Sequence, residues 1–398
     1  MHNVQKIQDD LINLGVNDRR ITLFENSHPV PRGMNYNCYL LLDEKTVLLD
    51  TIDRAVEGQF LENLTAGLDG RPLDFLVVNH MEPDHCAVIP ELIRRYPAMK
   101  IVGNKKTFQL IDQFYDVDLT DRTIEVKEGD LLETGRHKLT FFFAPMVHWP
   151  EVMLSYDQTD KILFSADVFG TFGPVDGRMY ADLYDFEAEY LPEARRYYAN
   201  IVGKYGRQVM SLFDKIGGLE FSLFCPLHGP VWRRDFEKIL KKYQQWGSYA
   251  PEEKGVVIAY GSVYGNTQLA VEILANKLAE ADEKTIVVHN VSGTDPSYVL
   301  SDCFRYDRVV LAASTFNNEV FPAMESLIFD LKNHNLTNRK VAVIENGSWA
   351  PQSGKKIREQ LEQMKGIQIM EEGVSLKSAV KEADVKALEA LAQALVAG

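Results

Sequence analysis

The stretch NHMEPDHCAVIP, residues 79–90, places four side chains that can bind metal within six residues. The apolar segment LDFLVVN, residues 73–79, precedes them and predicts a short strand that ends at the first histidine. Pro83 disfavours a helix interior, so the pattern does not fit the helical H-E-x-x-H motif of zinc proteases. We therefore expect a loop here, followed by a helix that starts near Val88. The four side chains are those of His80, Glu82, Asp84 and His85.

Three further candidate ligands each follow an apolar segment. His148 follows FFFAPMV, Asp167 follows ILFSA, and His228 follows FSLFCPL. Because strand ends gather at one edge of a sheet, we expect these side chains to converge on the first four. Seven ligands suit two metal ions if one carboxylate bridges them.

Length and charge limit the classes of protein to consider. A chain of 398 residues favours at least two domains. Its formal net charge of −14 makes a general nucleic-acid binder improbable, and no apolar run predicts a membrane helix. The first residues lack the apolar core of a signal peptide, so we expect a cytoplasmic protein. The four cysteines form no C-x-x-C pair, which excludes a built-in rubredoxin module and means that electrons must come from elsewhere.

The clearest break in the sequence lies at residues 247–255, GSYAPEEKG, after an amphipathic segment that predicts a helix. Before it, strands and helices are mixed, as in an α+β domain. After it, strand and helix alternate, which predicts an α/β domain with a doubly wound parallel sheet. The predicted domains are residues 1–250 and 251–398.

The loop YGSVYGNTQLA, residues 260–270, lies between a predicted strand and a predicted helix. It lacks both the G-K-[ST] of a triphosphate loop and the G-x-G-x-x-G of a dinucleotide site. Its hydroxyl groups and the backbone N–H groups at the helix start could bind one phosphate. The loops at residues 314–322 and 346–354 also follow predicted parallel strands, at the end of the sheet where ligands bind in such folds.

The metal motif resembles the metallo-β-lactamase fold, an αββα sandwich. Glu82 stands where the hydrolases of that fold have a histidine, and in this the chain is similar to the flavodiiron proteins over essentially its whole length. The resemblance implies two non-haem irons per chain, one held by His80, Glu82 and His148 and the other by Asp84, His85 and His228, with Asp167 as the bridge. A carboxylate in place of an imidazole favours iron over zinc.

The second half resembles flavodoxin, whose cofactor is FMN. In this resemblance one segment corresponds to the phosphate loop and two segments flank the flavin ring, where Trp349 is a candidate for stacking. The residues concerned are Ser262, Tyr264, Gly265, Asn266, Thr267, Thr315, Phe316, Asn317, Gly347, Ser348 and Trp349.

Together the two resemblances imply a reductase. Electrons would pass from an external donor, rubredoxin or a related reductant, through FMN to the diiron site, which would reduce O2 to water or NO to N2O. A head-to-tail homodimer, or a dimer of such dimers, would bring one chain's flavin beside the other chain's irons. Tyr197 is a candidate catalytic residue that could donate a proton to bound substrate, and Trp149 and Phe169 are expected in the pocket.

Two other classes stay open at this point. The chain could be a zinc hydrolase with a flavodoxin-like regulatory domain, which Glu82 disfavours. It could also be an electron carrier with a purely structural first domain, which the complete ligand set disfavours.

Overall fold

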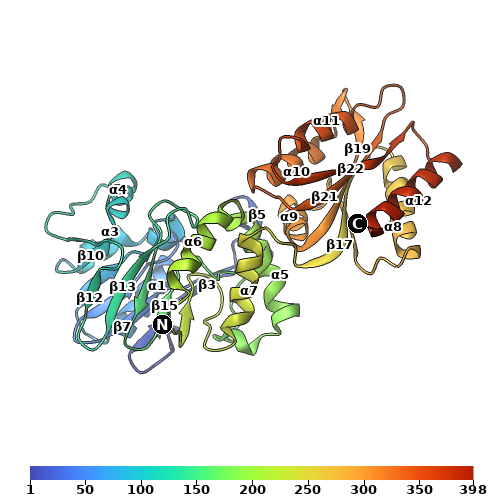
Figure 1. Cartoon of the computed structure of the whole chain (residues 1–398). Helices are drawn as coiled ribbons and strands as arrows, with labels where there is room; N and C mark the ends of the chain where they lie inside the picture. Colours follow the sequence, from blue (N-terminus) through green and yellow to red (C-terminus); the bar gives the residue numbers. More distant parts are fainter. Residues whose placement is uncertain (398) are drawn as a thin grey trace. The chain divides into compact units, whose positions relative to one another are not determined.

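The computed structural model describes residues 1–397, which divide into two compact units. Figure 1 shows the course of the chain through both. In the segment 247–255, α7 (Phe236–Gly247) ends and β17 (Glu253–Gly261) begins. No helix among the described residues is both long and apolar enough to cross a membrane. The first unit comprises Met1–Tyr197 and Arg207–Gln244, and the second comprises Tyr198–Gly206 and the chain from Gln245 onward.

Two sheets form the first unit, and apolar side chains from both build its core. Leu41 and Val77 of the larger sheet belong to the same buried cluster as Phe141 and Met153 of the smaller one. The larger sheet has the order β1 (Gln5–Lys6), β2 (Leu11–Asn13), β7 (Tyr39–Leu42), β8 (Thr46–Leu49), β9 (Phe75–Val77), β10 (Lys100–Gly103), β11 (Thr123–Glu125). The smaller has the order β12 (Leu131–Glu133), β13 (Lys138–Phe143), β14 (Met153–Asp157), β15 (Ile162–Phe164), β16 (Leu223–Cys225).

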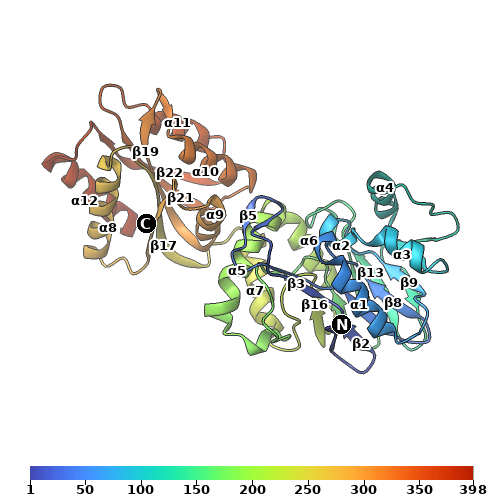
Figure 2. The same cartoon turned by 180° about the vertical axis from the view of Figure 1, so that it is seen from behind.

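Helices cover the outer faces of these sheets and give the expected αββα sandwich; Figure 2 shows α1 lying across strands of the larger sheet. Two short ribbons add to this unit: β3 (Val16–Asp18) pairs with β6 (Met34–Tyr36), and β4 (Leu23–Phe24) pairs with β5 (His28–Pro29). The remaining helices of the unit are α1 (Glu57–Leu68), α2 (Pro83–Cys86), α3 (Ile89–Arg95), α4 (Lys105–Phe114), α5 (Leu191–Tyr197) and α6 (Gly206–Ile216).

The structure corrects one prediction about the opening motif. Asp84 and His85 lie in the one-turn helix α2 rather than in a loop. Pro83 occupies the first position of this helix, where a missing N–H costs nothing and the fixed φ angle suits the helix. Proline therefore begins a helix here, although it would disrupt a helix interior. The next helix, α3, begins at Ile89, which confirms the helix expected near Val88.

The second unit is a parallel sheet with helices on both faces, as predicted. In chain order its main strands follow the 2-1-3-4-5 pattern of the flavodoxin-like fold. Figure 1 shows α8 and α12 on one face, with α9, α10 and α11 on the other. The sheet order is β18 (Ile286–Asn290), β17, β19 (Tyr306–Phe316), β21 (Arg339–Asn346), β22 (Ile367–Leu376), and β20 (Glu319–Val320) pairs with β19. The helices are α8 (Asn266–Glu280), α9 (Pro296–Arg305), α10 (Pro322–Asn333), α11 (Ser353–Leu361) and α12 (Glu382–Ala397).

A buried histidine outside the predicted site forms an ion-pair network in the first unit. The Nδ1 atom of His137 lies 2.8 Å from Asp157 Oδ2, and its Nε2 atom lies 3.1 Å from Asp10 Oδ2. The Arg136 guanidinium also contacts Asp10, at 2.7 Å. Burial lowers the pKa of His137, but hydrogen bonds to the two carboxylates outweigh this effect and raise it above its ordinary value of 6.5. The charged imidazolium is therefore the stabilising form.

Replacing His137 by Gln should remove a pH-dependent part of the folding stability. Because the folded pKa of His137 is raised, its contribution is complete below the unfolded pKa of about 6.5 and is lost as the pH rises through the folded value. The wild-type advantage over His137→Gln should be about 1.5 kcal/mol or more at about pH 5, and should shrink as the pH rises above about 6.5. Denaturant melts of both proteins across this range measure it; an advantage independent of pH would contradict the prediction.

Candidate metal centre and flavin pocket

Asp167 lies at the middle of the candidate metal centre, and its two oxygens face different groups of ligands. Asp167 Oδ2 is 3.2 Å from His148 Nε2 and 3.5 Å from His80 Nε2. Asp167 Oδ1 is 3.2 Å from His85 Nε2 and 3.7 Å from His228 Nε2. A carboxylate with this arrangement can bridge two metal ions, one on each oxygen.

Each group contains one further carboxylate. Glu82 Oε2 lies 3.0 Å from His148 Nε2 and 3.2 Å from His80 Nε2. Asp84 Oδ2 lies 3.3 Å from the Nε2 atoms of both His85 and His228. The structure thus brings together all seven side chains singled out in the sequence. The first group is His80, Glu82, His148 and Asp167, and the second is Asp84, His85 and His228; within each group the ligand atoms lie within 4.8 Å of one another.

The ends of strands place these ligands, from both sheets of the sandwich. His80 follows β9, and the one-turn helix α2 presents Asp84 and His85. His148 lies between β13 and β14, Asp167 follows β15, and His228 follows β16. The strands end at the same edge of the sandwich, so residues far apart in the chain meet there.

The donor set fits metal ions better than it fits a network of hydrogen bonds. Both Oδ atoms of Asp84 and the Oδ1 atom of Asp167 are buried without a hydrogen-bond partner among the described residues. The Nε2 atoms of His85 and His228 face each other at 3.1 Å. Burial opposes ionisation of Glu82 and Asp167, but the neighbouring imidazoles hold both carboxyl pKa values well below their ordinary values. Ionised carboxylates beside imidazole nitrogens can bind divalent metal ions.

Two carboxylates that the sequence analysis missed support the first group. Glu151 Oε1 accepts hydrogen bonds from His80 Nδ1 at 2.9 Å and from the backbone N–H of Met81 at 2.8 Å. Asp50 accepts the backbone N–H groups of Asn79 and His80, at 2.7 and 3.1 Å, and so fixes the turn that starts the motif. The position of Glu151, three residues after His148, was the only signal for it in the sequence.

Aromatic rings surround the ligands, although not all of those expected. Tyr197 is fully buried with its ring centroid 5.6 Å from that of His228, and its hydroxyl has no hydrogen-bond partner among the described residues. The ring of Trp149 meets that of His80 edge-on at 5.7 Å. Phe169 instead packs at 4.6 Å against Phe224 in the core, and no contact joins it to a ligand histidine among the described residues. Two rings that the sequence analysis missed contact His228: Phe24 at 5.4 Å and Tyr36 at 5.6 Å.

The candidate flavin pocket lies at the topological switch point of the second unit, where the loops after β17 and β19 diverge. It is a cavity of about 500 Å³, a size suited to a mononucleotide. Ten of the eleven predicted residues line it, and Gly265 is the N-cap of α8 beside it, with a φ of 90°. The sequence analysis missed Val263, Ser314, Asn318, Asn346, Ala350 and Ser378.

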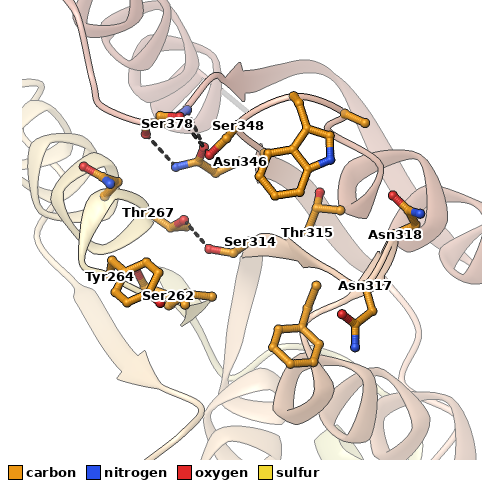
Figure 3. A pocket seen from close by; sticks show the side chains of 16 residues that line it. Ser262, Tyr264, Thr267, Ser314, Thr315, Asn317, Asn318, Asn346, Ser348 and Ser378 are labelled. Atoms are coloured by element: carbon orange, nitrogen blue, oxygen red, sulfur yellow. Dashed lines mark hydrogen bonds between the residues drawn. The ribbon is translucent and has the colours of Figure 1, made fainter.

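Hydrogen bonds between loops shape this pocket (Figure 3). Thr267 Oγ1 and Ser314 Oγ lie 2.9 Å apart, joining the α8 start to the end of β19. Asn346 Nδ2 donates to the carbonyl of Ser378 at 2.9 Å, which ties in a loop beyond β22. Trp349 is 90% exposed, so it does not serve the packing of this unit and its ring is available to a flavin.

Both halves of the chain match known families. Residues 34–229 match the ODP family beta lactamase, and residues 258–394 match flavodoxin. The anaerobic nitric oxide reductase flavorubredoxin of Klebsiella pneumoniae is 30% identical over 349 residues, which cover 86% of this chain and 72% of that protein. The protein of the same name from Escherichia coli is 31% identical over 323 residues, covering 80% and 67%.

Solved structures extend this likeness to the whole chain. The rubredoxin oxygen:oxidoreductase of Desulfovibrio gigas has a TM-score of 0.92 at 27% identity, covering 99% of both chains. A mutant of the flavo di-iron protein of Thermotoga maritima has a TM-score of 0.91 at 25% identity, covering 99% and 98%. A lactamase-like sandwich with a seven-ligand centre, joined to a flavodoxin-like unit, defines a class of two-domain oxidoreductases. The chain belongs to the flavodiiron protein family.

Replacing Glu151 by Gln should weaken metal binding without removing a ligand. The amide keeps the shape of the side chain but loses the charge that orients His80 and increases its basicity. We expect the metal affinity to fall by about 10- to 100-fold. Metal content after equilibration with graded chelator measures this. Glu133→Gln is a control, because Glu133 is an exposed carboxylate on β12; an equal loss of metal in both variants would contradict the prediction.

Proposed function

We propose that this protein is a reductase that passes electrons from an external donor through FMN to two non-haem irons, where O2 is reduced to water or NO to N2O. We propose further that residues 1–250 form the diiron domain and residues 251–398 the FMN domain. The observation that carries the proposal is that Glu82 and the shared carboxylate of Asp167 both lie beside His148 Nε2. The three acidic ligands offset most of the charge of two ferrous ions, which suits a site that changes oxidation state.

The ligand assignment follows the two groups. One iron would be held by His80, Glu82 and His148. The other iron would be held by Asp84, His85 and His228, and Asp167 would bind both irons. The irons and FMN would store the electrons, and the residues around them would fix the geometry and provide protons. Burial, followed by the charge of Asp167, raises the pKa of Tyr197 well above its ordinary value, so its hydroxyl keeps its proton. We propose that Tyr197 donates a hydrogen bond to bound substrate, because its hydroxyl is buried without another partner among the described residues.

The names of the similar proteins are consistent with NO and O2 as substrates and with rubredoxin as the electron donor. The Klebsiella relative is called a nitric oxide reductase, and the Desulfovibrio structure is called an oxygen oxidoreductase. Both names also contain rubredoxin. We propose rubredoxin or a related reductant as the donor, and a head-to-tail homodimer or a dimer of such dimers as the assembly. The exposed rings of Trp349 and Tyr264, at the rim of the pocket, support an interface there.

Replacing Ser262 by Ala should weaken the binding of FMN but not of riboflavin. Ser262 Oγ accepts the backbone N–H of Gly265 at 3.1 Å, which leaves its own hydroxyl hydrogen to donate to a phosphate at the α8 start. Loss of one hydrogen bond to a charged group should lower the affinity for FMN by about tenfold or more. Fluorescence titration of apoprotein with each flavin measures this, with exposed Ser292→Ala as the control. Equal weakening of both flavins would contradict the phosphate assignment.

The function itself is tested by metal content and by the variant Glu82→His. Wild-type protein purified without oxygen from its native host should hold about two irons per chain and reduce O2 or NO with a chemical donor. Glu82→His should shift the iron-to-zinc ratio toward zinc and lower reductase turnover by about 100-fold or more, because the site loses a charge that supports iron. Two zincs and no reductase activity in the wild type would overturn the proposal and favour a hydrolase. Full reductase activity in Glu82→His would instead contradict the role given to Glu82.

A further inference from the structure

The loop that carries His228 is held by the side chain of Asn37. Asn37 Nδ2 donates to the carbonyl of Pro226 at 3.0 Å and to that of Gly229 at 2.7 Å. The backbone N–H of Asn37 donates to the carbonyl of Leu227 at 2.7 Å. The carbonyls on both sides of His228 are therefore bound to one residue. Asn37 is 1% exposed, so water does not compete for these bonds.

Asn35, two residues earlier, binds the same loop and the ring itself. The backbone carbonyl of Asn35 accepts a hydrogen bond from His228 Nδ1 at 2.7 Å. This bond places the imidazole hydrogen on Nδ1 and leaves Nε2, which faces Asp84 and Asp167, as a ligand atom. The Oδ1 atom of Asn35 accepts the backbone N–H of Gly229 at 2.9 Å. Asn35 thus fixes both the orientation of the ring and the backbone next to it.

Two further asparagines form hydrogen bonds with the side chains of Asn35 and Asn37. Asn35 Nδ2 donates to Asn17 Oδ1 on β3, and Asn13 Nδ2 donates to Asn37 Oδ1, both at 3.2 Å. A small polar cavity of about 190 Å³ lies behind these four amides. The Gly229 backbone is equally constrained, since its φ is 83° and a Cβ atom there would lie 2.3 Å from Thr171 Cγ2. The loop therefore has little freedom to move away from the centre.

The neighbouring histidine in the same group has hydrogen bonds to its backbone carbonyl from Thr51 but none to its ring Nδ1 in the described part of the chain. His85 is fully buried, yet its Nδ1 atom has no hydrogen-bond partner among the described residues. In the first group, by contrast, His80 is oriented by Glu151. Within the second group, His228 is therefore the histidine whose ring is oriented by a hydrogen bond.

We propose that Asn35 and Asn37 are positioning residues for His228, and that together they keep the second metal position formed. The inference rests on the proposed function, since it takes the seven ligands to hold two metal ions. We call the side chains of Asn35 and Asn37 the asparagine clamp. Without it the loop loses three hydrogen bonds, those to the carbonyls of Pro226 and Gly229 and from the N–H of Gly229, and His228 can shift away from Asp84. The first group keeps all four of its own ligands, so its ion should remain.

The test compares the metal content of full-length variants. Asn37→Ala and Asn35→Ala should each lower the affinity for one ion by about 10- to 100-fold, so that dialysis against a weak chelator leaves about one iron per chain instead of about two. Iron analysis gives the count, and Mössbauer spectra show whether one of two sites is lost. Asn35→Ala removes a single side-chain acceptor from the loop, so it remains informative if Asn37→Ala does not fold.

Asn63→Ala is the matched control. Asn63 is another fully buried asparagine of the first unit, and its Nδ2 atom donates to the carbonyl of Leu14 at 2.9 Å. It should lose stability as the clamp variants do, yet keep both irons. Two irons in the clamp variants, or equal iron loss in Asn63→Ala, would overturn the inference. A wild-type protein without a metal pair would instead overturn the proposed function.

Discussion

The buried carboxylate of Asp167 is the constraint on which the first unit depends. It is 1% exposed and stays ionised because imidazoles surround it, despite the cost of burial. A charge in such a place must be compensated, and no Lys or Arg side chain forms an ion pair with it among the described residues. The compensation comes from histidines at the ends of strands of both sheets, together with the metal ions that they can hold. The two-layer architecture is what lets ligands from both sheets reach one point.

This dependence explains why the ligands could be found in the sequence. Each follows a short apolar segment, and the segments were recognisable as strands from their composition. The ends of strands must meet at sheet edges, so the convergence followed from the fold class. The local backbone conformation after His80 was harder to predict, since Pro83 begins α2 rather than preventing a helix. The rule against proline in helices applies to their interior, and a one-turn helix has almost none.

The residues that support the ligands could not be predicted in the same way. Glu151 contacts a histidine 71 positions earlier, and Asn35 contacts a glycine 194 positions later. Such contacts depend on how sheets and ribbons stack, which apolar periodicity does not encode. In the candidate flavin pocket, too, some residues were predictable from the fold class and others were not. The loops after β17, β19 and β21 were predictable from the parallel sheet. Ser378 lies beyond β22, outside these loops, and reaches the pocket through hydrogen bonds to Asn346 and Ser348, 32 and 30 positions earlier.

The two metal positions are supported by different chemistry, and this bears on a site that changes oxidation state. Glu151 brings a negative charge to His80, so it interacts more strongly with the first position as the positive charge there increases. The asparagines behind His228 are neutral, and their hydrogen bonds respond little to the charge of the centre. The first position is thus influenced by the charge of Glu151, whereas the second is held by neutral hydrogen bonds that fix the orientation of His228. In the proposed function, a pair of ions that accepts and releases electrons without losing its ligands would benefit from both. The charge of Glu151 would stabilise the oxidised pair, and the neutral asparagines would keep the loop of His228 in place in either oxidation state.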